Sequence, residues 1–224
     1  MNFAALHRWP TLPASAVALQ KRLAGSVRLE PVAGPVRWLA GADVAFSPDG
    51  TQVIAGVVVW DGQADEVVEA RVARVACRFA YVPGLLSFRE LPGVLAAFRG
   101  LRACPDAVLC DGQGLAHPRR LGLACHLGLW LGIPTVGCAK SRLCGEFVEP
   151  GTEKGAQAVL MHRGERVGTV LRTRANVRPL FVSPGHLCDH ASAVRLTLEA
   201  ARRYRLPEPT RLAHQLVTRA RRGG

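Results

Sequence analysis

The fold of this chain is decided by the stretch Val108-Leu109-Cys110-Asp111-Gly112-Gln113-Gly114-Leu115-Ala116-His117-Pro118-Arg119-Arg120-Leu121-Gly122. A short apolar run ends in an acid, a glycine-rich turn follows, and His117 and Pro118 then open a strongly apolar segment. This pattern predicts a buried strand that delivers the Asp111 carboxylate to the N-terminus of a helix over 118–131. Burying a carboxylate is costly without a cationic partner, and a metal ion is a good candidate for that partner.

The segments before this stretch predict two helices and a three-stranded antiparallel meander. Turn residues at 47–50 and 61–65 separate three runs rich in β-branched residues, and the loop Ala80–Gly84 ends the meander. A fourth strand then leads into the opening stretch. The predicted elements are a helix Leu12–Leu23, strands Val36–Phe46, Thr51–Trp60 and Glu66–Arg78, a helix Ser87–Leu101 and a strand Asp106–Asp111.

The segments after the opening stretch predict a strand Pro134–Ala139, a hairpin Ala158–Thr173, a strand Pro179–Val182 and helices Asp189–Arg203 and Pro209–Arg222. The strand–helix–strand spacing around Asp111 favours parallel pairing through a right-handed crossover. Three antiparallel strands followed by alternating helices and strands is the order of the ribonuclease H-like fold. We therefore expect a single α/β domain over 1–224, a mixed sheet flanked by helices with the first and fourth strands adjacent.

The composition favours a nucleic-acid partner. Lys and Arg number 29 against 17 Asp and Glu, a net charge of +12 that attracts polyanions. From Arg195 onward, eight arginines face two glutamates, which makes the C-terminal segment a candidate phosphate-facing surface. Seven cysteines without a C-x-x-C pair argue against a zinc site and a disulfide framework, and no apolar run is long enough for a membrane span. We expect a cytoplasmic monomer.

Two acids stand out because their surroundings are too apolar for an unpaired carboxylate. Asp43 interrupts the apolar strand Leu39–Phe46, and an isolated acid there is ordinarily explained by a bulge or a salt bridge. Strand order makes Asp43 a neighbour of Asp111, and two such carboxylates repel unless a proton or cation lies between them. Mg²⁺ uses one or two carboxylates with waters and phosphate oxygens, so this pair suits phosphodiester hydrolysis.

Four other side chains have both a functional and a structural interpretation. Glu90 suits the first turn of a helix, where acids are favoured, and His117 either contacts a phosphate at a helix N-terminus or caps its loop. Lys140 ends a strand at the same sheet edge as Asp111, where an ammonium neutralises phosphate, but lone lysines are mostly solvated. His214 lies one helical turn beyond Thr210, and lone helical histidines are mostly structural.

Two loop segments have recognisable chemistry. The glycines Gly112 and Gly114 are not a dinucleotide fingerprint, because His117 stands where the third glycine belongs; they instead allow a ligand to approach the backbone closely. Tyr81-Val82-Pro83 forms an aromatic and apolar tip that suits a wedge between bases, or a loop tucked onto the core. His126, inside the apolar helix, is interpreted as a core histidine.

Several motifs together resemble the endonuclease V family, the nucleases that act at deaminated adenine. They occur in family order from about Leu6 to Arg221, nearly the whole chain. The longest segment is the opening stretch from Asp111 to Gly122. The others are Tyr81-Val82-Pro83-Gly84-Leu85-Leu86-Ser87-Phe88-Arg89-Glu90, Pro134-Thr135-Val136-Gly137-Cys138-Ala139-Lys140-Ser141-Arg142-Leu143, Phe181-Val182-Ser183-Pro184-Gly185-His186 and Pro207-Glu208-Pro209-Thr210-Arg211-Leu212-Ala213-His214.

The resemblance implies a role for each motif residue. Asp43, Glu90 and Asp111 would be metal-binding catalytic carboxylates, His214 would position a water or second metal, and Lys140 would contact the scissile region. Tyr81, Val82 and Pro83 would form a wedge beside an extruded base. Its hypoxanthine edge would be read by backbone near Gly84, Leu86 and Gly112, with His117 lining the site. Ser87 departs from the usual alanine and Cys125 from the expected serine.

The implied reaction is hydrolysis of the second phosphodiester bond on the 3′ side of deoxyinosine, leaving 3′-hydroxyl and 5′-phosphate ends. Mg²⁺ is the implied cofactor, with Mn²⁺ as a substitute, and DNA containing deoxyinosine or other deaminated or mismatched bases is the implied partner. Two alternatives stay open: a ribonuclease of the same fold that cuts inosine-containing RNA, and a non-catalytic nucleic-acid-binding protein that uses the basic C-terminal surface.

Overall fold

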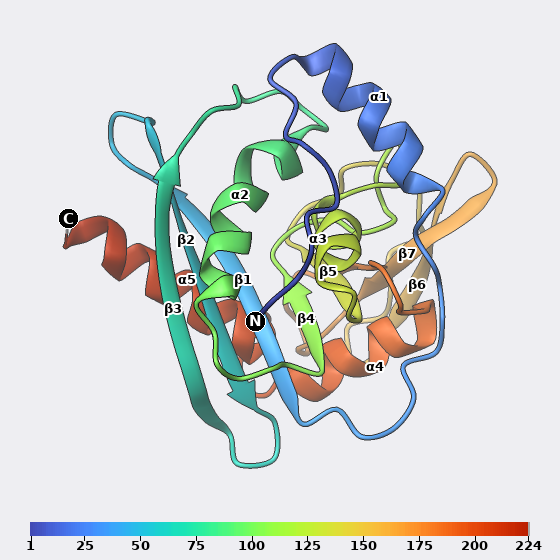
Figure 1. Ribbon diagram of the computed structural model, residues 1–224. Helices are drawn as coiled ribbons and strands as arrows, with labels where there is room; N and C mark the ends of the chain where they lie inside the picture. Colours follow the sequence, from blue (N-terminus) through green and yellow to red (C-terminus); the bar gives the residue numbers. More distant parts are fainter. Residues whose placement is uncertain (224) are drawn as a thin grey trace.

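The computed structural model describes residues 1–223 and contains one eight-stranded mixed sheet in the order β3-β2-β1-β4-β5-β8-β7-β6 (Figure 1). The α/β ribonuclease H-like arrangement predicted from the strand order is confirmed. In chain order the elements are α1 (Pro13–Ala24), β1 (Trp38–Phe46), β2 (Gln52–Asp61), β3 (Glu66–Ala76), α2 (Leu86–Arg99), β4 (Ala107–Cys110), α3 (Leu123–Leu131), β5 (Thr135–Ala139), β6 (Gln157–His162), β7 (Glu165–Leu171), β8 (Leu180–Pro184), α4 (His190–Ala200) and α5 (Glu208–Arg222).

The centre of the sheet brings the two predicted acids to the same edge. Strand β1 pairs with β2 in antiparallel and with β4 in parallel register, and the last β1–β4 pair joins Ala42 to Cys110. The next residue on each chain segment is an acid, Asp43 or Asp111. Strand β4 also pairs in parallel with β5, which ends one residue before Lys140. The predicted adjacency of these strands is therefore confirmed.

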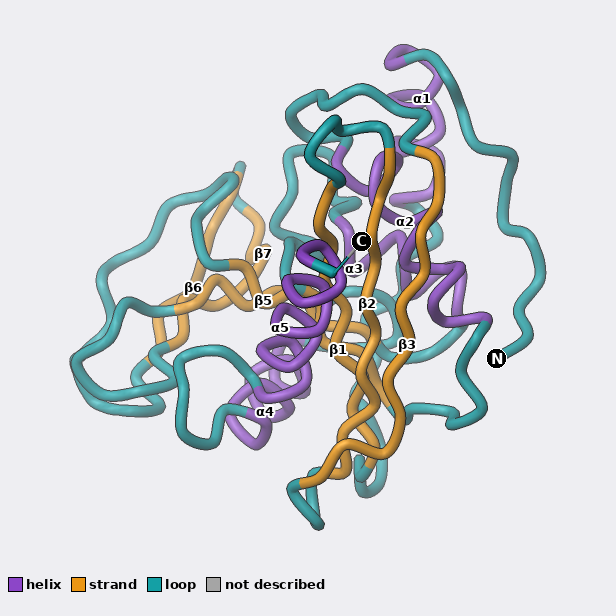
Figure 2. The backbone as a smooth tube through the Cα atoms, turned by 90° about the vertical axis from the view of Figure 1, so that its left-hand side faces the viewer, coloured by secondary structure: helices purple, strands orange, loops and turns teal. Residues whose placement is uncertain are grey.

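Helices cover both faces of this sheet (Figure 2). Alternate residues of the central strands point to opposite faces, so Ala40 and Val108 pack against α2 and α3 while Leu39 and Leu109 pack against α4. Figure 2 shows α5 and α4 together on one side of the meander and α2 on the other. Among residues 1–223, no helix combines the length and apolar character needed to cross a membrane.

Helix α5 lies against the sheet with its backbone in direct contact with β1. A Cβ atom on Gly41 would stand 2.0 Å from the Pro209 carbonyl oxygen and 2.5 Å from the Thr210 nitrogen. One turn later, the same helix brings His214 to Asp43. Glycine at this strand position therefore sets how closely the C-terminal helix approaches the acidic edge of the sheet.

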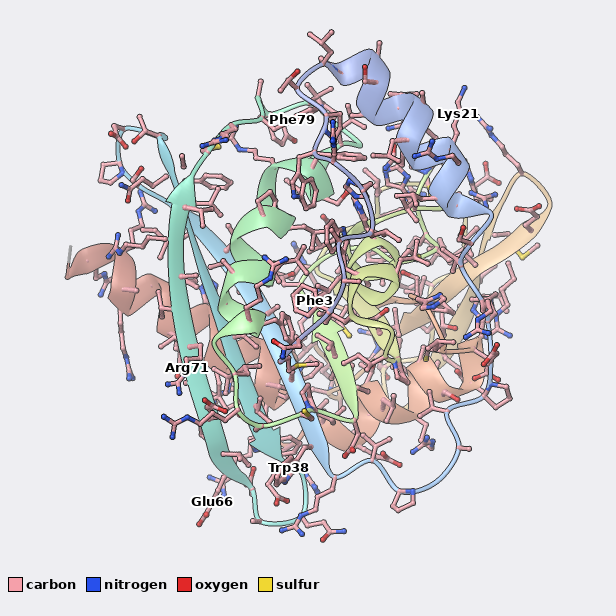
Figure 3. The ribbon with its side chains drawn as sticks, viewed as in Figure 1. Phe3, Lys21, Trp38, Glu66, Arg71 and Phe79 are labelled. Atoms are coloured by element: carbon pink, nitrogen blue, oxygen red, sulfur yellow. The ribbon has the colours of Figure 1, made fainter. Side chains whose placement is uncertain are left out.

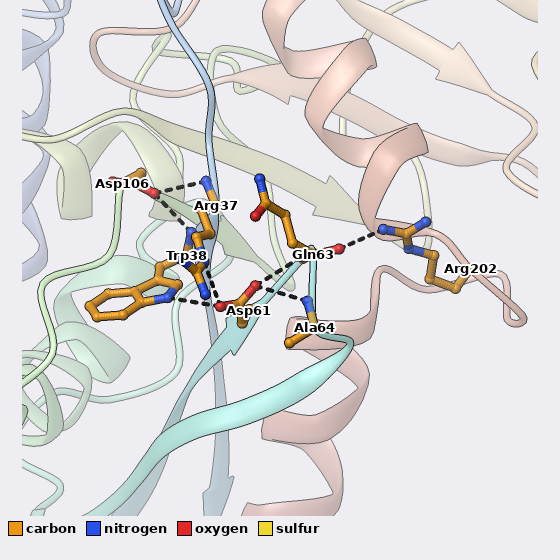
Figure 4. A network of polar contacts seen from close by, with 8 residues as sticks. Arg37, Trp38, Asp61, Gln63, Ala64, Asp106 and Arg202 are labelled. Atoms are coloured by element: carbon orange, nitrogen blue, oxygen red, sulfur yellow. Dashed lines mark hydrogen bonds and ion pairs between the residues drawn. The ribbon is translucent and has the colours of Figure 1, made fainter.

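At the opposite end of the sheet, Asp61 and Asp106 hold neighbouring segments together through hydrogen bonds (Figure 4). Asp61 is 4% exposed and accepts hydrogen bonds from Arg37 Nε at 2.7 Å, Trp38 Nε1 at 3.2 Å and the Gln63 and Ala64 amides. The Ala64 amide is the largest cause that lowers the pKa of Asp61 to about 2. Asp106 accepts from the Arg37 and Trp38 amides, so the starts of β1 and β4 and the β2–β3 turn form one network.

The predicted helix over 118–131 is wrong at its start, because α3 begins only at Leu123. The preceding loop bonds to strand β8 instead: the Gly114 amide donates to Ser183 Oγ at 2.8 Å and the Leu115 amide to the Pro184 carbonyl at 2.7 Å. Arg120 has φ of 57°, a left-handed conformation that interrupts a helix. The final helices also differ slightly from prediction, since α4 ends at Ala200 rather than Arg203.

We predict that Gly41→Ala destabilises the protein by about 3 kcal/mol or more, because the added methyl group meets helix backbone that cannot rotate away. Gly25→Ala is the matched control: Gly25 has φ of −68°, and a Cβ added there would lie 3.7 Å from the nearest atom. Urea unfolding of the two variants measures the difference. Equal unfolding free energies would contradict the tight β1–α5 contact.

Candidate active site

Three carboxylates from three different elements face one another at the acidic edge of the sheet. Asp43 lies within β1 just after its last pair with β4, Asp111 follows β4, and Glu90 reaches in from α2. The Asp43 and Asp111 side chains are only 13% and 17% exposed. Glu90 lies in the second turn of α2, so the ordinary explanation of an acid in the first helical turn does not apply to it. The fold therefore brings together three acids that mutually repel.

Two basic side chains contact this group. His214 Nδ1 lies 2.7 Å from Asp43 Oδ2, and the Lys140 ammonium donates a hydrogen bond to Asp111 Oδ2. Both basic side chains are about half exposed, at 55% and 41%. All five residues proposed for catalysis from the sequence thus meet at one place in the fold.

Burial and the neighbouring negative charges favour protonation of Asp43 and Glu90. Burial raises the pKa of Asp43, and the nearby Asp111 adds to the effect. Burial raises the pKa of Glu90 to about 8, with further contributions from the charges of Asp43 and Asp111. At neutral pH and without a cation, Glu90 therefore holds a proton.

The chemistry of this donor set fits a hard divalent cation, because carboxylate oxygens are the ligands that Mg²⁺ prefers and its charge would relieve the repulsion. The side chains as they stand are not preformed for it. Within residues 1–223, no three His, Cys, Asp or Glu side chains are arranged to hold a metal ion. Lys140 and His214 instead engage two of the acids.

A cavity of about 410 Å³ lies beside the carboxylates. Asp111 and Lys140 line this cavity and also belong to the group of five residues described above. Tyr81, at 68% exposure, stands at its edge, whereas Val82 packs into an apolar cluster with Phe79, Leu85 and Phe88. The cavity is lined by Gln20, Tyr81, Pro83, Gly84, Leu86, Ser87, Asp111, Gly112, Gln113, His117, Leu121, Gly122, Leu123, Ala139, Lys140, Ser141, Arg142 and Leu143. Of the residues predicted from the sequence for base recognition, only Val82 is not in the lining.

His117 lies in the cavity wall but not at a helix N-terminus, so its predicted position at such an end is wrong, and the alternative of a hydrogen-bonded loop histidine is confirmed. Its side chain is 3% exposed, and burial together with Arg119 lowers its pKa to about 4. Nδ1 accepts from the Arg119 amide at 3.1 Å, which leaves the proton on Nε2, 3.0 Å from the Gly84 carbonyl oxygen. His117 is therefore a neutral donor within the wall of the cavity.

Sequence reasoning missed several residues of this region. Gln20 is 1% exposed and lines the cavity from α1; its signal was a polar residue at helical spacing between the buried Ala16 and Leu23. Ser87, unusual for the resembled family, contacts the core residue His126 at 3.0 Å, and His126 also contacts His7 at 2.7 Å. The interpretation of His126 as a satisfied core histidine is confirmed.

Comparison with known proteins agrees with this architecture. A family model described as Endonuclease V matches residues 21–215. An Endonuclease V from Methanothrix thermoacetophila is 51% identical over 99% of this chain and 98% of its own. The solved Endonuclease V of Streptomyces avermitilis has a TM-score of 0.90 at 44% identity, covering 95% of this chain and 94% of that one.

The same fold also occurs in an Endonuclease V from Ciona intestinalis, solved with a 23mer DNA containing an inosine followed by a ribo-adenosine. Its TM-score is 0.82 at 22% identity, covering 93% of this chain and 96% of that one.

The family match and the full-length relatives define a hydrolytic endonuclease, an enzyme that cleaves phosphodiester bonds within a chain. The chain belongs to the Endonuclease V family.

The raised pKa of Glu90 predicts a pH-dependent stability in the protein stripped of divalent metal. The folded form prefers a protonated Glu90, so this contribution is complete below about pH 4.5 and is lost as pH rises through about 8. Glu90→Gln, which is neutral throughout, should be more stable than wild type at pH 8 by on the order of a few kcal/mol. Denaturant unfolding with a chelator at pH 5, 7 and 8.5 measures this; parallel pH curves for the two proteins would contradict it.

Proposed function

We propose that this endonuclease recognises deoxyinosine in DNA and hydrolyses the second phosphodiester bond on its 3′ side, leaving 3′-hydroxyl and 5′-phosphate ends. The observation that supports this most is the meeting of Asp43, Glu90 and Asp111 beside a cavity that shares Asp111. Asp111 thereby belongs both to the carboxylates that would act on the phosphate and to the wall of a cavity large enough for an extruded base.

In this proposal Asp43, Glu90 and Asp111 hold Mg²⁺, with Mn²⁺ as a substitute. When bound, the ion neutralises charge on the phosphate and lowers the pKa of water. Glu90 must give up its proton to serve as a ligand, because a carboxylic acid is a poor donor to a cation. Lys140 then exchanges its contact with Asp111 for a phosphate oxygen near the scissile bond, and His214 positions a water or a second ion from α5.

Base recognition would take place in the cavity. Tyr81 and Pro83 would form the exposed part of the wedge and Val82 would anchor it in the apolar cluster, while Gly84, Leu86 and Gly112 would present backbone to the hypoxanthine edge beside His117. Extruding a base from a duplex costs on the order of a few kcal/mol, and least where pairing is already weak. Selectivity for inosine mismatches would arise partly from that lower cost.

The charge distribution supports DNA as the partner. The last turn of α5 contains Arg219, Arg221 and Arg222, on the same helix that brings His214 to the carboxylates. Phosphates of the strand can therefore follow α5 toward the acidic edge. Seven free cysteines support the expectation of a reducing, cytoplasmic location, and we propose that the enzyme acts as a monomer.

An end-labelled duplex with one deoxyinosine, incubated with Mg²⁺, should be cut at a single position, the second phosphodiester bond on the 3′ side of the inosine. Asp43→Asn and Asp111→Asn should each slow cleavage by about a thousand-fold, because each removes charge that holds the ion. Asp65→Asn, on the exposed β2–β3 turn at the far end of the sheet, is the control. Wild-type rates in the two site variants would refute the carboxylate assignment.

Binding separates from cleavage in this proposal. Because a carboxylate repels phosphate, Asp43→Ala should bind inosine-containing DNA at least as tightly as wild type when no divalent metal is present. Fluorescence anisotropy with a labelled duplex measures the affinity, and complete loss of binding would count against the prediction. Faster cutting of an inosine-bearing RNA strand than of the matched DNA strand would make RNA the substrate.

A further inference from the structure

The carbonyl oxygen of Gly84 is the meeting point of three side-chain donors. Gln20 Nε2 lies 3.1 Å away, Arg119 Nη2 lies 2.8 Å away, and the protonated Nε2 of His117 lies 3.0 Å away. These donors come from α1 and from the loop before α3, two segments far apart in sequence. A carbonyl oxygen has two lone pairs, so this one is fully used within the protein.

Gln20 joins the parts of this network. Its amide nitrogen donates to the Leu121 carbonyl at 2.8 Å as well as to Gly84, and its amide oxygen accepts from Arg119 Nε. Two carbonyl acceptors on one side and a guanidinium donor on the other fix the orientation of the amide. Every polar group of this buried side chain is therefore committed to holding two loops together.

Apolar contacts strengthen the same attachment. Ala16 on α1 forms a cluster with Phe79, Leu85 and Phe88, and Val82 packs against it. Phe79 lies near the start of α2, and Lys21, next to Gln20, is on the outer, exposed side of α1 (Figure 3). Helix α1 therefore contacts the loop 79–85 and the first turn of α2 through one polar and one apolar contact area.

The loop is tightly bent at Gly84 and presents an exposed aromatic residue, Tyr81. Gly84 has φ of +78°, a conformation that favours glycine, and its carbonyl oxygen accepts all three donors, so a shift of the turn would break these hydrogen bonds. Tyr81 is 68% exposed three residues earlier. Unstacking bases costs free energy, so a side chain that separates them must be held by a rigid loop.

We propose that Gln20 is a positioning residue for base extrusion: it holds the turn at Gly84 rigid while Tyr81 and its neighbours separate inosine from the duplex. This inference rests on the proposed function. It assigns α1, which contributes no residue to the carboxylate site, a part in the reaction. Loss of the Gln20 hydrogen bonds should slow cleavage where the base must be extruded from a duplex and should change it little where the base is already unpaired.

The test compares Gln20→Glu with wild type on one inosine in two settings, paired with cytosine in a duplex and in the single strand. The variant retains the acceptor for Arg119 and loses both N–H donors to Gly84 and Leu121. We expect kcat/KM for the duplex to fall about ten-fold while the single-strand value changes less than about two-fold. Gln63→Glu, the same chemical change on an exposed turn, is the control and should leave the ratio unchanged.

A second readout requires no cleavage. With a chelator present, 2-aminopurine placed beside the inosine should brighten on binding wild type, as stacking is lost, and brighten less with Gln20→Glu. An equal loss on both substrates, or no loss on either, would overturn the positioning role, since a general folding defect lowers both rates together. Failure of the wild-type protein to cut either substrate would instead contradict the proposed function.

Discussion

Repulsion among three carboxylates at one end of the sheet is the constraint on which the site depends. Asp43, Glu90 and Asp111 come from separate elements, and each is partly withdrawn from water. Without a bound cation, the chain relieves the repulsion with a proton on Glu90 and with contacts from Lys140 and His214. In the proposed mechanism, a divalent ion would take the place of the proton on Glu90 and would free Lys140 from its contact with Asp111.

Two close backbone contacts, each at a glycine, pack other elements around these carboxylates. Helix α5 can bring His214 to Asp43 only because Gly41 lets the Pro209 carbonyl lie directly on the strand. In the same way, the loop before α3 lies close to β8 because Gly114 has no Cβ, which would otherwise stand 2.1 Å from the Pro184 carbonyl oxygen. These two glycines thus set how closely α5 and the loop before α3 approach the sheet.

Most of the sheet could be predicted from the sequence because alternation and strand order are local signals that survive in the fold. The adjacency of Asp43 and Asp111 followed from those signals alone. The start of α3 could not, since Pro118 suits a helical first turn and the competing hydrogen bonds to β8 come from residues about seventy positions later. Gln20 was missed for a related reason: its partners lie far away in the sequence, and two of the three are backbone carbonyls, which leave no trace in residue type.

The network around Asp61 has a consequence for how this chain can change over time. It ties β1, β4 and the β2–β3 turn together at the end of the sheet farthest from the carboxylates. The hydrogen-bonded network and the carboxylates therefore lie at opposite ends of the same strands. Substitutions in the loops at the carboxylate end can therefore reshape the cavity while the hydrogen bonds at the other end keep β1, β4 and the β2–β3 turn in place.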